Sequence, residues 1–367
     1  MPVSQRLRDE RKRNGLTLGE VAKRTGIGES SLSEFEHGHR DPKLAQLQRL
    51  AETYRRTIAY FLDDGGPAPE IVLWRQKPEP TVAAQIEAEF LQLSRQYHNL
   101  EVWCAERRPC ELPAAAGDPA TFDYANAERL AYDVRAKLTL GDRPGQSLLP
   151  VLEEVCGVKL FHLSFEPPGT AASSVSETYG SAVLLNARNV RWRRNFDLAH
   201  ELFHLLTWNV FRSGDGEGIV ASEREEKLAT CFASNLLMPA DVTRLAVNDA
   251  IKNDKIGFDD LFAIARQFDV SVEALLWRIH FLYRCDEVDT RKDIERCKLF
   301  AAAWEDREQD TPTERPARFV ALAIKAFRRG QLSQGRFAEY MGISRREAMK
   351  FAEQEARQDE AVAIPSA

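Results

Sequence analysis

The sequence lacks the features that mark membrane, secreted and disulfide-stabilised proteins. No apolar run in its 367 residues approaches the roughly 20 residues that a helix needs to span a bilayer. The N-terminus carries charge from Arg6 onward and shows no apolar core of a signal peptide. The six cysteines have no short paired spacing, which argues against a zinc knuckle or a redox dithiol. We therefore expect a cytoplasmic protein with no membrane partner.

Charge is unevenly distributed along the chain. Residues up to Leu62 include 12 Lys/Arg and 8 Asp/Glu, a net charge of +4; the formal total is −6, so the remainder carries −10. A basic head on an acidic body suits phosphate contact at one end. A length of 367 residues is too great for one compact core and predicts two or three domains.

The most informative segment is His-Glu-Leu-Phe-His at residues 200–204. Residues 196–206 contain no Gly or Pro and are apolar almost all round, which predicts a buried helix. At about 3.6 residues per turn, His200 and His204 point the same way, and Glu201 is offset by roughly 100° toward the same cavity. This predicts a zinc site with Glu201 as general base, although two core histidines would give the same pattern.

A second helix is predicted downstream, over residues 222–238. Ser222 followed by Glu225 is a capping box, and Pro239 marks the helix end. Glu225 lies near the centre of the apolar face of this helix and Glu226 lies on its rim. Either carboxylate can reach inward to a metal ion, and the helical wheel alone favours Glu225 slightly.

The two segments together resemble the ImmA/IrrE family of metallo-endopeptidases. The resemblance rests on RNFDLAHELFHLL at residues 194–206 and EKLATCFASNLLMP at residues 226–239. It implies that His200, His204 and Glu226 are the metal ligands, with Glu225 as the fallback, and that Glu201 is the catalytic base. Three positions depart from the family pattern without removing a ligand: Asp197 replaces Thr, Phe203 replaces Gly and Thr230 replaces Asn.

The resemblance also implies a zincin-like α+β domain. Zinc is the metal expected by ligand type, and manganese or iron also suits imidazole and carboxylate ligands. The segment 179–186 matches the strand that the family places before the motif helix, and we expect such a strand to pair with an extended substrate by edge addition. The expected protein substrate is a repressor, cleaved to release genes of stress responses or mobile elements.

The N-terminal segment predicts a helix-turn-helix. Thr17 is a helix cap, residues 26–28 form the turn, and a second helix runs from Glu29 to Phe35. This layout resembles the lambda-repressor and Cro type, also called XRE, whose second helix enters the major groove. We expect Ser30, Ser31, Ser33 and Glu34 near base edges. Phosphate contacts are expected from Arg6, Lys12, Arg40 and Lys43.

Two features favour a different role for this unit. Glu29, Glu34 and Glu36 make the second helix acidic, and Leu18 stands where family members often have a Gln that touches the DNA backbone. The alternative is a docking or dimerisation module. By analogy with repressors, a homodimer is expected.

The predicted organisation is multidomain and mainly α. Residues 1–62 form the all-α helix-turn-helix domain, 63–121 a linker and helical connector, 122–283 the zincin-like metallopeptidase domain, and 284–367 a helical C-terminal region with a disordered tail from about residue 358. Within the last region, short helices are expected at residues 333–340 and 344–353. Residues 341–343 separate them, an arrangement that again imitates a helix-turn-helix. Five arginines give it local positive charge, which suits a second DNA or partner contact; a helical cap with solvated arginines is the favoured interpretation.

Two functional hypotheses follow. In the first, the chain is a DNA-binding regulator with a zinc endopeptidase domain, and its helix-turn-helix brings the protease to the operator where a repressor substrate sits. In the second, it is a non-proteolytic DNA-binding regulator or antitoxin, whose metal domain senses a signal or docks a toxin partner. The complete set of ligands and base favours the first hypothesis, since a retired site would tolerate loss of Glu201.

Overall fold

The computed structural model describes residues 2–14, 16–54, 56, 58–62, 70–108, 112–212, 220–253, 255–302 and 311–355. Residues 63–69, at the start of the predicted linker and helical connector, and the tail from about residue 358 lie outside these residues. No helix in the described part of the chain is both long and apolar enough to cross a membrane.

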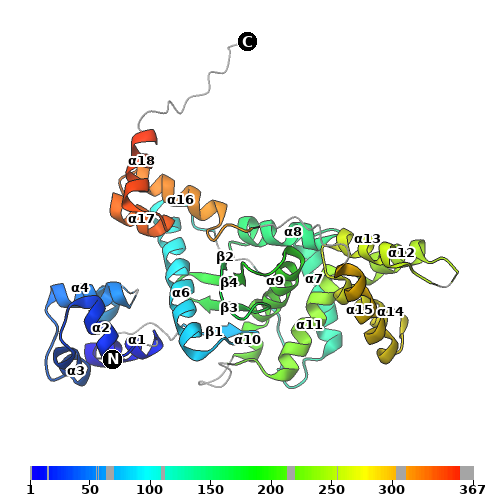
Figure 1. The fold of residues 1–367 in the computed structure, drawn as a ribbon, viewed down its shortest axis with the longest axis horizontal. Coiled ribbons are helices and arrows are strands. Elements are labelled where there is room, and N and C mark those ends of the chain that lie inside the picture. The colour runs from blue at the N-terminus through cyan, green and yellow to red at the C-terminus, as the bar shows by residue number, and fades with distance from the viewer. Residues whose placement is uncertain are drawn as a thin grey trace, which may run out of the picture.

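The N-terminal unit is all-helical and has a core of its own. Its helices are α1 (Val3–Arg13), α2 (Leu18–Thr25), α3 (Glu29–His37), α4 (Leu44–Thr53) and α5 (Ile58–Leu62). The Thr17 side chain accepts a hydrogen bond from the backbone of Glu20 at the start of α2, and Gly26 ends that helix with a left-handed φ of 67°. The helix-turn-helix predicted from the sequence is therefore present (Figure 1).

Alternating charges join this unit to the connector. Arg56 pairs with Glu10 of α1 at 3.0 Å and with Glu70 at 2.8 Å. Glu70 in turn pairs at 2.5 Å with Arg95 of α6 (Pro80–Trp103). These side chains are largely buried, so the pairs are screened by solvent much less than surface pairs.

A four-stranded sheet lies in the second part of the chain. Its strands are β1 (Val72–Trp74), β2 (Lys159–Leu163), β3 (Ala171–Ser176) and β4 (Gly180–Asn186), in the order β1-β3-β4-β2. β3 runs antiparallel to β1 and β4, whereas β4 is parallel to β2. The expectation that segment 179–186 pairs with substrate by edge addition is therefore wrong. β4 is internal, and its backbone groups already pair with β3 and β2.

Helices cover both faces of the sheet. Leu160, Val183 and Leu185 belong to a core shared with α9 (Arg191–Leu206) and α11 (Glu223–Leu237). Phe161 and Leu184, on the opposite face, belong to a separate core. The first layer also holds α7 (Tyr124–Lys137), α8 (Pro144–Pro150), the π-helix η1 (Val151–Val155), α10 (Trp208–Phe211), α12 (Ala240–Ala250), α13 (Phe258–Phe268), α14 (Val272–Tyr283) and α15 (Glu287–Ala302).

The second layer joins the connector to the C-terminal region. It consists of α6 with α16 (Ala317–Arg328), α17 (Gln334–Met341) and α18 (Arg345–Glu355), and Figure 1 shows α6 standing beside the sheet with these helices at one end. Arg318 of α16 donates to Glu101 of α6 at 2.5 Å, and both side chains are buried. Segments about 200 residues apart thus share one core with the sheet. The chain is mainly helical, as predicted, and its sheet is small and mixed.

Candidate metal centre

The motif helix α9 is buried because its sequence is apolar on nearly every side. It contains no Gly or Pro, and Leu198, Leu202 and Phe203 are fully buried. The helix packs on β3 and β4 with one side and on α11 with another. His200 and His204, four residues apart, therefore point together toward α11 from a rigid support.

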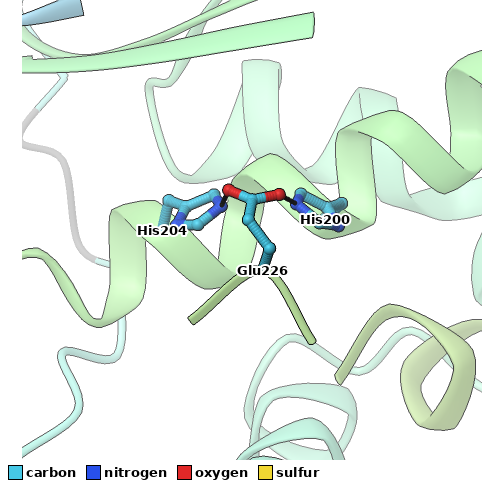
Figure 2. Close-up of side chains that lie close together, drawn as sticks. All are labelled: His200, His204 and Glu226. Atoms are coloured by element: carbon cyan, nitrogen blue, oxygen red, sulfur yellow. Dashed lines mark hydrogen bonds and ion pairs between the residues drawn. The ribbon is translucent and has the colours of Figure 1, made fainter. Parts of the chain in front are cut away.

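The three residues inferred as metal ligands lie together. Glu226, in the first turn of α11, places Oε2 at 3.0 Å from His200 Nε2 and Oε1 at 3.3 Å from His204 Nε2. One ligand atom from each residue falls within 4.8 Å of the others. Figure 2 shows the Glu226 carboxylate between the two imidazole rings. The histidines are buried, while a quarter of the Glu226 side chain is exposed, so the cluster meets solvent on the Glu226 side.

The residues present fit a divalent cation. His204 Nε2 and Glu226 Oε1 are buried and make no hydrogen bond in the described part of the chain. Buried polar atoms that make no hydrogen bond are costly, and one ion placed between them and His200 would satisfy all three side chains. Two imidazole nitrogens and one carboxylate oxygen form a donor set of catalytic zinc sites, where a fourth position stays open to water.

Glu225, the alternative ligand, has a different place. It accepts a hydrogen bond from His204 Nδ1 at 2.9 Å, on the side of the ring opposite Nε2. Arg212 donates to both oxygens of Glu225, at 2.7 and 3.1 Å. Glu225 therefore lies behind the ring and directs His204 Nε2 toward Glu226. A carboxylate in this position fixes the tautomer and the orientation of a metal-binding histidine.

The charges of the cluster are strongly perturbed. Burial lowers the pKa of His200 to about 3. Burial also acts to lower the pKa of His204, but its carboxylate partners Glu225 and Glu226 outweigh burial and raise that pKa to about 9. For Glu226, the two neighbouring histidines outweigh burial and lower the pKa to about 2. Without a metal ion, one imidazolium, on His204, thus balances the Glu226 carboxylate at neutral pH.

Glu201 is completely buried beside this cluster. Burial raises the pKa of its carboxyl to about 7, and the positive charge of His204 and the nearby Ser173 hydroxyl of β3 partly offset the rise. Neither carboxylate oxygen makes a hydrogen bond of ordinary geometry in the described residues. A carboxylate that exchanges a proton near neutral pH is suited to general acid–base work.

Asp197 connects this helix to the connector. The residue is fully buried, and its Oδ1 accepts from Arg75 at 2.6 Å and from Arg193 at 3.0 Å. Its other oxygen accepts from Asn189 at 2.9 Å. The positive charge of Arg75 also lowers the pKa of Glu201. Sequence reasoning missed this role of Arg75; the departure from the family pattern at Asp197 was the available signal.

The residues predicted to contact DNA fall into two groups. Ser30, Glu34, Lys12, Arg40 and Lys43 are exposed, and Ser31 and Ser33 are half-buried on α3. The prediction for Arg6 is wrong. Its side chain is among the largest that are fully buried, and it donates to the backbone carbonyl of Tyr60, so in this conformation it cannot reach a phosphate.

Comparisons with known proteins match two separate regions of the chain. Residues 7–61 match the helix-turn-helix family, and residues 153–280 match the IrrE N-terminal-like domain. The chain is 34% identical over 62 residues to the HTH-type transcriptional regulator ImmR of Bacillus subtilis (strain 168). It is 38% identical over 63 residues to the HTH-type transcriptional regulator DdrOP3 of Deinococcus deserti. Each alignment covers 17% of this chain and 49% of the relative, so the chain spans about half the length of the curated relatives it matches.

One solved structure, the apo form of ComR from S. thermophilus, aligns over 90% of this chain and 99% of its own at 12% identity. Its TM-score of 0.17 is too low to carry any argument about this fold. The two family matches agree with the positions of the helix-turn-helix and of the His200–Glu226 cluster. The chain therefore joins an XRE-type helix-turn-helix domain to an IrrE N-terminal-like domain of the M78 peptidase family.

Proposed function

We propose that this chain is a DNA-binding transcriptional regulator whose second domain is a zinc-dependent endopeptidase that cleaves a repressor-type protein. The observation that supports the hydrolytic half most strongly is the convergence of His200, His204 and Glu226 beside the buried base Glu201. A site that had lost its chemistry would not need four ionisable groups in a dry interior, where each is costly to bury.

The residues divide the work in a definite way. When bound, a zinc ion would lower the pKa of a water ligand and polarise a peptide carbonyl. Glu201 takes a proton from the attacking water and, with its pKa raised to about 7, holds it for transfer to the leaving amide nitrogen. Glu225 keeps the His204 ring in one orientation throughout.

The sheet constrains how a polypeptide substrate is held. β3 lies against α9, and β1 occupies the position beside β3. An extended substrate that joins the sheet on this side has to pair with β1 or displace it. Arg75 follows β1 directly and binds Asp197 on the motif helix α9. A substrate that pairs with β1 or displaces it would therefore change the contact between Arg75 and α9.

The helix-turn-helix would direct the peptidase domain to a DNA site. The names of the two matched regulators support DNA binding by this half. Exposed Arg40 and Lys43 lie between α3 and α4 and are available for phosphate contacts with an operator. Bringing the peptidase to that operator would raise its local concentration near a repressor bound to the same DNA, and a homodimer would match a palindromic site.

A Glu201→Gln variant tests the proposal. Zinc-loaded wild-type protein and the variant are incubated with repressors encoded by neighbouring genes, and cleavage is followed by mass spectrometry. We expect the variant to bind zinc and DNA as the wild type does but to cleave at least about 100-fold more slowly, as for loss of a general base. Glu223→Gln, an exposed change in the same turn of α11 as Glu226, is the matched control. Equal cleavage by wild type and Glu201→Gln would contradict the proposal.

A second candidate is a regulator or antitoxin whose metal domain binds a partner, such as a toxin, without cleaving it. The burial of His200, Glu201 and His204 favours it, because only the Glu226 side of the cluster is open to solvent. The same experiment separates the two functions. Under this second function, zinc-loaded wild-type protein binds its partner and leaves it uncleaved, and Glu201→Gln does not change that binding.

A further inference from the structure

The C-terminal helices repeat the spacing of the N-terminal helix-turn-helix. Thr17 and Ser333 each accept a hydrogen bond at the start of a helix, from the backbone of the third residue beyond. Gly26 and Gly342, nine residues after those caps, end the two helices with the same left-handed φ of 67°. The following helices, α3 and α18, begin at Glu29 and Arg345, three residues after each glycine. Segments 17–35 and 333–351 thus align without a gap.

The inward-facing positions of the two segments also correspond. Five pairs of positions, each 316 residues apart, occupy the same place in the two segments. Both members of every pair are buried or half-buried. The pairs are Val21 with Phe337, Ala22 with Ala338, Ile27 with Ile343, Leu32 with Ala348, and Phe35 with Phe351. Phe337 contacts Phe351 with ring centroids 5.2 Å apart, which packs α17 against α18. The two units therefore share the internal packing of a helix-turn-helix as well as its turn.

The outward-facing positions of the second helices differ in charge. The first two turns of α3 carry Glu29 and Glu34, both exposed. At the start of α18 the exposed side chains are Arg345, Arg346 and Lys350, with Glu347 as the single acidic residue in these turns. In a helix-turn-helix this is the part of the second helix that enters the major groove. The C-terminal unit is thus basic where the N-terminal unit is acidic.

Three other basic residues of this region are used for packing. Arg318 binds Glu101, Lys325 pairs with Glu106, and Arg329 donates to the backbone carbonyl of Cys104, so that α16 is fastened to α6 and the segment after it. By contrast, the side chains of Arg345, Arg346 and Lys350 make no hydrogen bond or ion pair within the described residues. Figure 1 shows α17 and α18 at the end of α6, beyond the sheet. Three unpaired positive charges are therefore gathered at the start of α18, at the periphery of the molecule.

We propose that α17 and α18 form a second helix-turn-helix that binds duplex DNA through Arg345, Arg346 and Lys350. Residues 311–355 contain nine Lys/Arg and five Asp/Glu, a net charge of +4, although the whole chain is acidic. Clustered basic residues on a reading helix are the electrostatic footprint of a nucleic-acid surface. A protein-docking surface would carry exposed apolar or aromatic anchors, whereas the start of α18 exposes one large apolar side chain, Met349. This contact is additional to DNA binding by α3 and independent of peptidase activity.

Salt dependence of DNA binding tests the proposal on the full-length chain. The variant Arg345→Ala/Arg346→Ala/Lys350→Ala and the wild type are titrated against a fluorescent duplex of about 60 base pairs at several salt concentrations. The logarithm of the DNA-binding constant falls linearly with the logarithm of the salt concentration. Losing three phosphate contacts should make this slope shallower by about 2 to 3 and weaken binding about tenfold or more at low salt. The matched control removes three exposed charges elsewhere, as Lys137→Ala/Arg244→Ala/Arg266→Ala, and should keep the slope of the wild type.

Melting curves show whether the variant is folded, and we expect no change because the three side chains are exposed and unpaired. If the triple variant does unfold, Arg346→Ala alone replaces it, with an expected slope change of about 1. A folded variant with the affinity and the slope of the wild type would overturn the proposal and leave α18 as part of a helical cap. Cleavage is not used as a readout, so failure of the peptidase proposal would leave this result unaffected.

Discussion

Replacing Glu225 with glutamine tests how the cluster holds His204. Glu225 accepts from His204 Nδ1 at 2.9 Å and is held in place by Arg212, whose side chain is 4% exposed. Glutamine keeps the shape of the side chain but removes the charge that fixes the imidazole tautomer. Loss of such an outer partner typically weakens metal affinity about 10- to 100-fold, which corresponds to about 1.4 to 2.8 kcal/mol.

The measurement is a competition between the protein and a zinc chelator of known affinity, with thermal melting of the metal-free protein alongside. We expect Glu225→Gln to weaken zinc binding within that range and to lower the melting temperature, because Arg212 keeps a buried charge without its ion-pair partner. Glu223→Gln is the control, since Glu223 is 84% exposed on the same helix. Glu226→Gln should weaken binding more than Glu225→Gln. The reverse order would refute the assignment of Glu226 as ligand and of Glu225 as its support.

Three further predictions follow from buried charges. Burial lowers the pKa of His204, but its two carboxylate partners raise it to about 9, so a metal ion must displace a proton from this ring. The affinity for zinc should therefore rise with pH up to about 9. Calorimetry in several buffers should show about one proton released per ion at pH 7. Burial raises the pKa of Glu153 from 4.5 to about 7, because the buried carboxyl is more stable when protonated. The protonated side chain therefore stabilises the fold fully below pH 4.5, and this stabilisation is lost as pH rises through 7. Glu153→Gln should raise the free energy of unfolding at pH 8 by about 2 kcal/mol, and a pH-independent difference would contradict this. Asp197→Ala should lower the free energy of unfolding by about 3 kcal/mol in urea titrations, because Arg75, Arg193 and Asn189 lose their shared hydrogen-bond acceptor. No change would show that these contacts do not fasten β1 to α9.

Local patterns predicted the helices of the site, and the strand expected at residues 179–186 is present as β4, but β3 was not predicted. The His200–His204 spacing and the Ser222 cap act within a few residues, so the sequence was sufficient for α9 and the start of α11. β3 was not predicted because Ala171–Ser176 is made of small and polar residues with little of the usual strand signal. Its small side chains lie where α9 packs, and that requirement is visible only in three dimensions.

Other features depended on contacts between distant segments. A helical wheel points both Glu225 and Glu226 inward, and the position of Arg212 decides which carboxylate supports His204 from behind. Arg6 looked like a phosphate contact because a basic residue near a terminus is usually exposed, yet it reaches the carbonyl of Tyr60, 54 residues away. The sequence also gave no sign that the connector and the C-terminal region form one layer on the sheet.

The most direct test of the central claim is the metal content of the purified chain. If His200, His204 and Glu226 hold a zinc ion, the wild type should contain about one zinc per chain by mass spectrometry of the metal, as expected of a three-ligand site. Glu226→Ala should remain folded and lose that zinc during dialysis. A wild-type protein that binds no divalent metal, or a Glu226→Ala variant that keeps its zinc with unchanged affinity, would contradict the account.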